Sequence, residues 1–147
     1  MLRLRWTSLS GPVPLFLGQL TNLNFLDLSF NNLIGSITPE LAKLTQLGAL
    51  HLDRNKLTGT IPESFEKFTE NIPDLYLSHN QLTGDIPKSL RYLNFTVIDF
   101  SRNQLTDVLF FFYFFIYKKN KAKWQFERFE LKIPKIPLVK NGVFGLS

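Results

Sequence analysis

Asparagine and glycine recur at nearly constant intervals through residues 1–107. The asparagines lie 24, 25 and 23 residues apart, at Asn31, Asn55, Asn80 and Asn103. The glycines keep the same frame, with intervals of 24, 24 and 25 residues, at Gly11, Gly35, Gly59 and Gly84. A period of this size predicts a solenoid, because one short unit cannot bury its apolar side without a stacked neighbour. Counting a partial first unit at residues 2–14, we expect about five coils.

Each unit places an apolar-x-apolar segment shortly before its asparagine. Alternate residues of a strand point to one side, so these apolar residues should stack as core columns. The predicted columns are Leu26 with Leu28, Leu50 with Leu52, Leu75 with Leu77, and Ile98 with Phe100. The asparagine amide is expected to bond backbone groups that the following turn leaves unpaired.

A short helical turn should then cross the convex side of each coil. The glycine permits the tight turn that follows the asparagine. Proline is favoured at the first position of a helix, which suits Pro39, Pro62 and Pro87. The turn would return a second apolar pair to the core, namely Leu41 with Leu44, Phe65 with Phe68, and Leu90 with Leu93.

The pattern L-x-L-x-x-N at this period is the leucine-rich-repeat signature. We therefore predict an α/β leucine-rich-repeat solenoid of about five coils with a concave parallel β-sheet over residues 1–107. Residues 108–147 fit no coil and form a separate tail. The coil ending L-x-G-x-I-P, seen at Leu57–Pro62, resembles that of plant members of the class.

More narrowly, residues 1 to about 106 resemble the polygalacturonase-inhibiting proteins of plants. The match lies in five stretches, at residues 9–14, 25–32, 50–59, 73–80 and 98–103. The resemblance implies a secreted cell-wall protein that inhibits fungal polygalacturonases, with pectin as a further partner to test. The chain has no cysteine caps, fewer coils than the family and no visible signal peptide, so it resembles a truncated member. A fragment of a receptor-like ectodomain and a non-functional truncated gene product are the alternatives.

Outward positions of the strands should form parallel columns on the concave face. Mixed charged and aromatic residues on a rigid sheet favour a protein-binding surface, since tyrosine and arginine are enriched in binding hot spots. The selected contact residues are Asp27, Ser29, His51, Asp53, Asp74, Tyr76, Ser78, His79, Asp99 and Ser101.

The same columns do not predict an enzyme. Asp27, His51 and Ser78 lie on adjacent strands, but the sheet is open to water and has no strained nucleophile turn or converging oxyanion donors. His51 and His79 fall in different columns with no carboxylate at ligand spacing, so we expect no metal and no cofactor. Asn94 begins the glycosylation triplet Asn-Phe-Thr.

The tail differs in composition from the repeats. It holds 8 Lys/Arg against 2 Asp/Glu and 8 of the 15 phenylalanines. Its apolar run, Val108–Tyr117, is about half the ~20 residues of a membrane-spanning helix, and its lysines come with no nucleic-acid motif. An improvised cap, a membrane-surface anchor and translated A/T-rich non-coding sequence are the three interpretations. The last is favoured, because an exposed aromatic run is an aggregation hazard.

Overall fold

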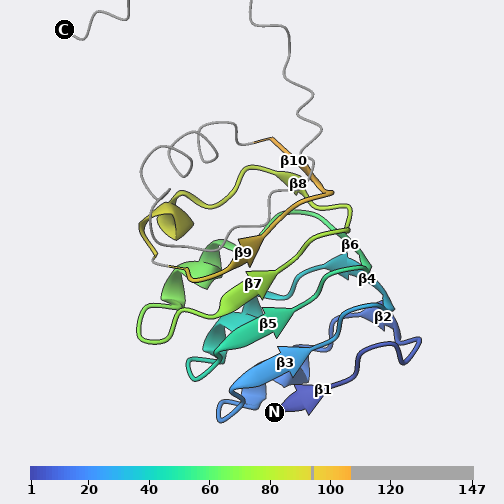
Figure 1. Cartoon of the computed structure of the whole chain (residues 1–147), viewed down its shortest axis with the longest axis horizontal. Helices are drawn as coiled ribbons and strands as arrows, with labels where there is room; N and C mark the ends of the chain where they lie inside the picture. Colours follow the sequence, from blue (N-terminus) through green and yellow to red (C-terminus); the bar gives the residue numbers. More distant parts are fainter. Residues whose placement is uncertain (94, 107–147) are drawn as a thin grey trace, which may run out of the picture.

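The computed structural model describes residues 1–93 and 95–106, and the predicted tail, 108–147, lies outside them. Five coils stack in sequence order, and each contributes one strand to a five-stranded parallel sheet (Figure 1). The sheet order follows the chain: β1 (Leu2–Arg3), β3 (Phe25–Asp27), β5 (Ala49–His51), β7 (Asp74–Tyr76) and β9 (Ile98–Asp99). The solenoid and its parallel sheet are confirmed.

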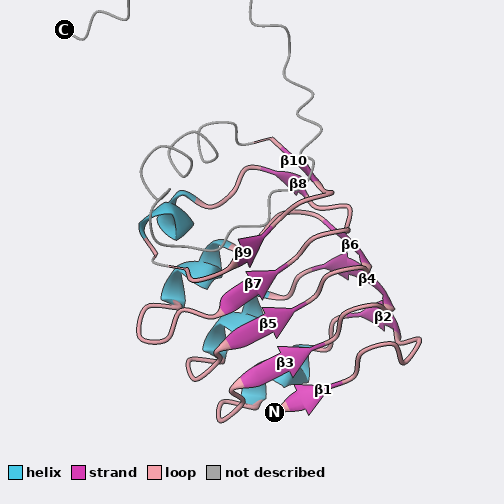
Figure 2. Ribbon diagram, viewed as in Figure 1, coloured by secondary structure: helices cyan, strands magenta, loops and turns pink. Residues whose placement is uncertain are grey.

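A second set of parallel strands runs along one side of the solenoid (Figures 1 and 2). Four of these strands follow an asparagine, the first follows Thr7, and they pair from coil to coil. Three form one sheet, namely β2 (Ser10–Pro12), β4 (Asn32–Ser36) and β6 (Lys56–Thr58). The other two form a pair, β8 (Thr83–Gly84) with β10 (Gln104–Leu105). The sequence analysis did not predict this second sheet.

Short 3-10 helices close the first four coils on the side away from the five-stranded sheet (Figure 2). They are η1 (Leu15–Gln19), η2 (Pro39–Lys43), η3 (Glu63–Lys67) and η4 (Lys88–Tyr92). Pro39 opens η2 as predicted, and Thr38 accepts a hydrogen bond from the amide of Glu40. The prediction is wrong for Pro62 and Pro87, which precede the first helical residue. Proline suits that place too, because it needs no amide hydrogen and the backbone there is extended, with ψ of 130° at Pro62.

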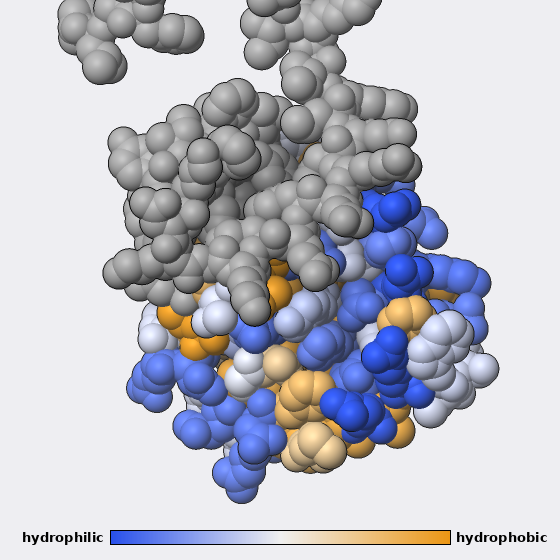
Figure 3. Space-filling view, viewed as in Figure 1, coloured by the Kyte–Doolittle hydropathy of each residue, from blue (hydrophilic) through white to orange (hydrophobic). Residues whose placement is uncertain are grey.

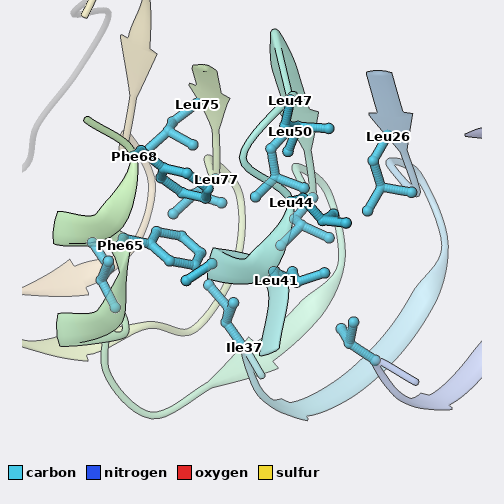
Figure 4. Packing of buried hydrophobic residues seen from close by; sticks show 14 of the residues in the cluster. Leu26, Ile37, Leu41, Leu44, Leu47, Leu50, Phe65, Phe68, Leu75 and Leu77 are labelled. Atoms are coloured by element: carbon cyan, nitrogen blue, oxygen red, sulfur yellow. The ribbon is translucent and has the colours of Figure 1, made fainter. Parts of the chain in front are cut away.

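The core lies between the two sheets and the helices, and the predicted strand columns are all buried. Figure 4 shows side chains from three coils meeting there, with Leu50 and Leu75 facing Leu44 and Phe68. The helical pairs are buried too, except that Leu93 is only partly covered. Phe65 and Phe68 replace leucines in the third coil and pack with ring centroids 5.0 Å apart. Burying each such side chain contributes roughly 1.5–3 kcal/mol.

The asparagines form a ladder that joins each coil to the one before it. We call Asn31, Asn55, Asn80 and Asn103 the asparagine ladder. The Asn55 amide nitrogen donates to the carbonyls of Leu28 and Leu52, at 3.0 and 3.1 Å. Its amide oxygen accepts from the backbone N–H of Leu33, at 3.0 Å. Asn80 and Asn103 repeat all three bonds one and two coils later. The predicted bonding role of the asparagines is thus confirmed.

Asn55→Ala should destabilise the solenoid by about 3 kcal/mol, because three buried backbone groups lose their partner and each costs about 1–3 kcal/mol. Asn55→Asp keeps an oxygen that accepts from the Leu33 amide. Its second carboxylate oxygen would face the carbonyls of Leu28 and Leu52 in place of the amide N–H donor, so this variant should be destabilised by a similar amount at neutral pH. Urea unfolding of the full chain followed by circular dichroism measures both.

Lys56→Ala is the matched control for these variants. Lys56 is exposed beside the ladder, so its removal should change the unfolding free energy by no more than about 0.5 kcal/mol. If Asn55→Ala unfolds at the same urea concentration as Lys56→Ala, the ladder does not hold the coils together.

Candidate functional site

The concave face consists of the outward residues of the five-stranded sheet and the residues just after each strand. The register pairs Arg3 with Asp27, Asp27 with His51, His51 with Tyr76, and Tyr76 with Asp99. Five side chains from five coils therefore stand side by side, as the repeat predicted. Neighbouring strands in a sheet lie about 4.8 Å apart, which sets the spacing of this column.

Three rings on this face form what we call the aromatic row: Phe25, His51 and Tyr76. The His51 and Tyr76 rings are stacked, 4.1 Å apart and 7° from parallel. Phe25 lies 5.3 Å from His51 in a tilted arrangement, and the Arg3 guanidinium sits 5.0 Å from the Phe25 ring. All three rings are partly exposed. Figure 3 views this side of the molecule, where apolar surface gathers near β3 within a mainly hydrophilic face.

Several selected contact residues form hydrogen bonds with backbone amides. Asp27 is only 4% exposed, and its carboxylate accepts from the amide and hydroxyl of Ser29, at 3.0 and 2.6 Å. Asp99 accepts from the Ser101 amide, and Asp74 accepts from the Val97 amide. Three serines offer little surface because they are buried: Ser29, Ser78 and Ser101. The other four selected residues are partly exposed: His51, Asp53, Tyr76 and His79.

A second row, which we call the cationic column, borders the face just before the asparagine ladder. It consists of Arg54, His79 and Arg102, all held at a positive φ of 54°. Residues other than glycine adopt this conformation rarely, and the next residue in each case is a ladder asparagine that fixes the turn. A shallow depression of about 310 Å³ opens between the column and the strands, lined by Asp53, Arg54, Ser78, His79, Asp99, Ser101 and Arg102.

Several exposed residues of the face were not among the selected contacts. Phe25, Arg54 and Arg102 fall in columns that flank the L-x-L segments. Phe30 stacks on Trp6 with centroids 4.4 Å apart, and the Arg5 and Arg54 guanidinium groups lie 4.4 and 4.9 Å from its ring. The alternation of the sequence placed them in outward columns. Their stacking depends on the left-handed backbone at Phe30, which the pattern did not reveal.

The surroundings on the concave face favour the neutral forms of the Tyr76 phenol and the His79 imidazole. Burial raises the pKa of the Tyr76 phenol, and the nearby Asp74, Asp53 and Asp99 carboxylates raise it further. Burial lowers the pKa of His79 below its ordinary value, and the positive charges of Arg54 and Arg102 add to this shift. His79 Nδ1 is buried without a hydrogen-bond partner.

The geometry offers no assembled catalytic triad among residues 1–93 and 95–106. The Asp27 carboxylate is engaged by Ser29 and by Arg3, whose Nε lies 3.4 Å away. His51 Nδ1 instead lies 3.8 Å from the carboxylate of Asp53. Within the described residues, no group of three or more His, Asp or Glu side chains could hold a metal ion. Asn94, the predicted glycosylation site, lies outside them.

A family model for leucine-rich repeats matches three segments, residues 22–44, 46–68 and 71–93. Each segment carries one strand of the five-stranded sheet, one ladder asparagine and one 3-10 helix. The chain is a leucine-rich-repeat solenoid. A comparison with curated proteins found no significant match.

Solved structures similar to this leucine-rich-repeat chain come from plants. A plant ice-binding protein is 57% identical, with a TM-score of 0.69, over 74% of this chain and 35% of that one. The ectodomain of the Arabidopsis thaliana receptor kinase GASSHO1/SCHENGEN3, solved with Casparian strip integrity factor 2, is 37% identical over 65% of this chain and 12% of that one, with a TM-score of 0.62. The Arabidopsis receptor kinase HAESA, solved with the peptide hormone IDA and a co-receptor, is 38% identical over 71% and 17%, with a TM-score of 0.66.

The chain thus spans about a third or less of these three structures. The GASSHO1/SCHENGEN3 structure is the leucine-rich-repeat ectodomain of a plant membrane receptor kinase. Among the residues that the structure describes, no helix is long and apolar enough to cross a membrane.

The pKa of His79 should lie below its ordinary value of 6.5 in the folded chain, since burial and two arginines disfavour the imidazolium. Unfolding restores the ordinary pKa, so the unfolded chain binds more protons below pH 6.5. The contribution of His79 to stability should therefore be constant above that pH and fall as the pH decreases through the interval between the two pKa values. An NMR titration of the imidazole carbons measures the shift.

Arg102→Ala should move the His79 pKa toward 6.5, because one of the two repelling charges is removed. Lys67→Ala, on the opposite side of the solenoid, should leave it unchanged. A His79 pKa at or above 6.5 in the folded wild-type chain contradicts the electrostatic description of this column.

Proposed function

We propose that this chain is a protein-binding module and that its concave face binds and inhibits a fungal polygalacturonase. The observation that carries the proposal is the aromatic row, whose partly exposed rings contact one another across three strands between charged neighbours. Rings fixed by their neighbours lose little conformational freedom on binding, which is why such residues form hot spots. The resemblance of the repeats to polygalacturonase-inhibiting proteins supplies the class of partner.

The rigidity of the sheet supports binding without rearrangement. The ladder asparagines fix the backbone at the end of each strand, so the side chains of the face keep a constant spacing. Preorganised surfaces bind more tightly for the same contact area.

The cationic column supports recognition of a partner that presents carboxylates next to an apolar patch. Arg54 and Arg102 are exposed, and the depression between them is open to solvent. Arginine binds carboxylates with two parallel hydrogen bonds, which gives orientation as well as affinity. The same chemistry suits an acidic segment of an enzyme, the carboxylates of pectin, or a peptide such as those bound by the receptor neighbours. Inhibition of the enzyme distinguishes the first from the others.

The double variant His51→Ala/Tyr76→Ala should weaken inhibition about 30-fold, because it removes the stacked pair at the centre of the face. The assay measures release of reducing sugar from polygalacturonate by a panel of fungal polygalacturonases, with the full chain added at increasing concentration. Circular dichroism melts of wild type and variant establish that both are folded.

Lys67→Ala, on η3, is the matched control and should inhibit like the wild type. Failure of the folded wild-type chain to inhibit or bind any enzyme of the panel would reject the inhibitor proposal. Binding to pectin or to a peptide in that case would assign the face to the other partners.

Ice binding is a second candidate function, favoured by one specific observation. The similar structure with 57% identity is that of a plant ice-binding protein. The chain also carries exposed threonines and serines at fixed positions of successive coils, away from the concave face. The two candidates concern different surfaces, so one chain can be tested for both.

The full chain should slow the coarsening of ice crystals in an annealed sucrose solution at concentrations where lysozyme has no effect. It should also be enriched in the ice fraction when ice is grown slowly from a dilute solution. The double variant His51→Ala/Tyr76→Ala should keep both properties. Exclusion of the folded wild-type chain from ice would reject this second function.

A further inference from the structure

The second sheet presents a cluster of hydroxyl groups on the side of the solenoid, among exposed Asn32, Ile34, Lys56, Gln81 and Gln104. We define the hydroxyl face by Ser36, Thr58, Thr60, Thr83 and Thr106, which are all exposed. They alternate along the chain with buried leucines such as Leu33, Leu57 and Leu82. Figure 1 shows the strands that carry or directly precede them, β4, β6, β8 and β10, following one another along one side. The buried leucines fix which side chains point outward.

Hydroxyl groups of neighbouring coils pair at two junctions of the second sheet. Ser36 and Thr58 are direct partners in adjacent strands. The Thr83 amide donates to the Gly59 carbonyl at 2.8 Å, which brings Thr83 beside Thr60. On the following coil, Gln81 lies beside Thr58 and Gln104 pairs with Thr83, while Thr106 lies beside Asp85. Ser36, Thr58, Thr60 and Thr83 therefore form one contiguous cluster drawn from three coils.

The sheet fixes the spacing of these hydroxyl groups. Neighbouring strands lie about 4.8 Å apart, and alternate residues of one strand are roughly 6.6 Å apart. Threonine is branched at Cβ and therefore stiff at χ1, so its hydroxyl and methyl groups lose little freedom when they contact an ordered water layer.

Charge separates this face from the other surfaces of the solenoid. A charged side chain holds its own hydration shell, which does not match the water arrangement in ice. The helical side carries Glu40, Lys43, Glu63, Glu66, Lys67 and Lys88, and the concave face carries several arginines and aspartates. On the described part of the second sheet and its adjoining turns, the charged residues are Lys56 and Asp85. Asp85 accepts a hydrogen bond from Thr106 at 2.7 Å, so its carboxylate is partly occupied.

We propose that the hydroxyl face is the surface through which this chain adsorbs to ice, with Thr58 and Thr83 at its centre. The inference rests on ice binding as the second function above and assigns it to one surface. Threonine hydroxyls would hydrogen-bond to water of the lattice, and their methyl groups would fill spaces between those waters. Lys56 limits the fit, because its ammonium group borders Ile34 and Thr58 on the same face.

The test compares variants of the full chain in ice recrystallisation and in partitioning into slowly grown ice. Thr58→Lys/Thr83→Lys should need about a tenfold higher concentration for the same inhibition. His51→Lys/Tyr76→Lys adds the same charge to the concave face and should match the wild type. Lys56→Thr should lower the required concentration, a gain that misfolding cannot produce. Circular dichroism melts accompany each variant.

The outcomes test the location of the ice-binding surface separately from ice binding itself. If the wild-type chain adsorbs to ice and Thr58→Lys/Thr83→Lys does so equally well, the proposed face is wrong while ice binding stands. A loss of adsorption in the concave variant alone would overturn the location in the same way. If the folded wild-type chain does not adsorb to ice, both the second function and this inference fail.

Discussion

The asparagine ladder is the interaction on which the rest of this structure depends. A polypeptide that leaves a strand and turns sharply exposes backbone amides and carbonyls, and burying them unpaired costs about 1–3 kcal/mol each. Each ladder asparagine satisfies a carbonyl of its own coil and both a carbonyl and an amide of the preceding coil. One side chain therefore stabilises the turn and also joins the coil to its neighbour. Neither aspartate nor leucine can do this, since the site needs a donor and an acceptor together.

The ladder also explains why two different surfaces are kept regular. Just before each asparagine, the left-handed residue directs Arg54, His79 or Arg102 to the border of the concave face. Just after it, the chain enters the second sheet and presents threonine or serine outward. The concave face varies from coil to coil, which suits a protein partner of irregular shape. The hydroxyl face gathers serine and threonine side chains from three successive coils, which suits the ordered water surface proposed as its ligand.

Much of the fold could be predicted from the sequence because the period is explicit. The columns at Leu50 and Leu75, the turns at the asparagines and the parallel sheet all follow from side-chain alternation within a stacked coil. The second sheet was missed because its strands are two to five residues long and interrupted by glycine. Their pairing depends on how the coils are offset, which the sequence of one coil does not reveal.

The sequence predicted where the residues of the candidate site lie on the sheet, but it did not predict which of their side chains are exposed. Alternation placed Asp27, Ser29 and Ser78 in outward columns, yet hydrogen bonds and close neighbours bury all three. It could not reveal that Phe25, His51 and Tyr76 would share ring contacts, because that depends on side-chain rotamers across coils. Nor did it distinguish Arg54 and Arg102 from ordinary surface arginines. Their position at the border of the face depends on a positive φ, which the sequence does not predict for a residue other than glycine.

The central claim is that the concave face, and not another surface, contacts a protein partner. The most direct measurement is an amide NMR spectrum of the isotope-labelled full chain, recorded alone and with an inhibited polygalacturonase. Signals of residues 25–30, 49–54 and 74–79 should broaden or shift, while those of residues 33–36, 56–60 and 81–85 should keep their relative intensities and positions. Perturbation centred on the second group, with the first group unchanged, would contradict this claim.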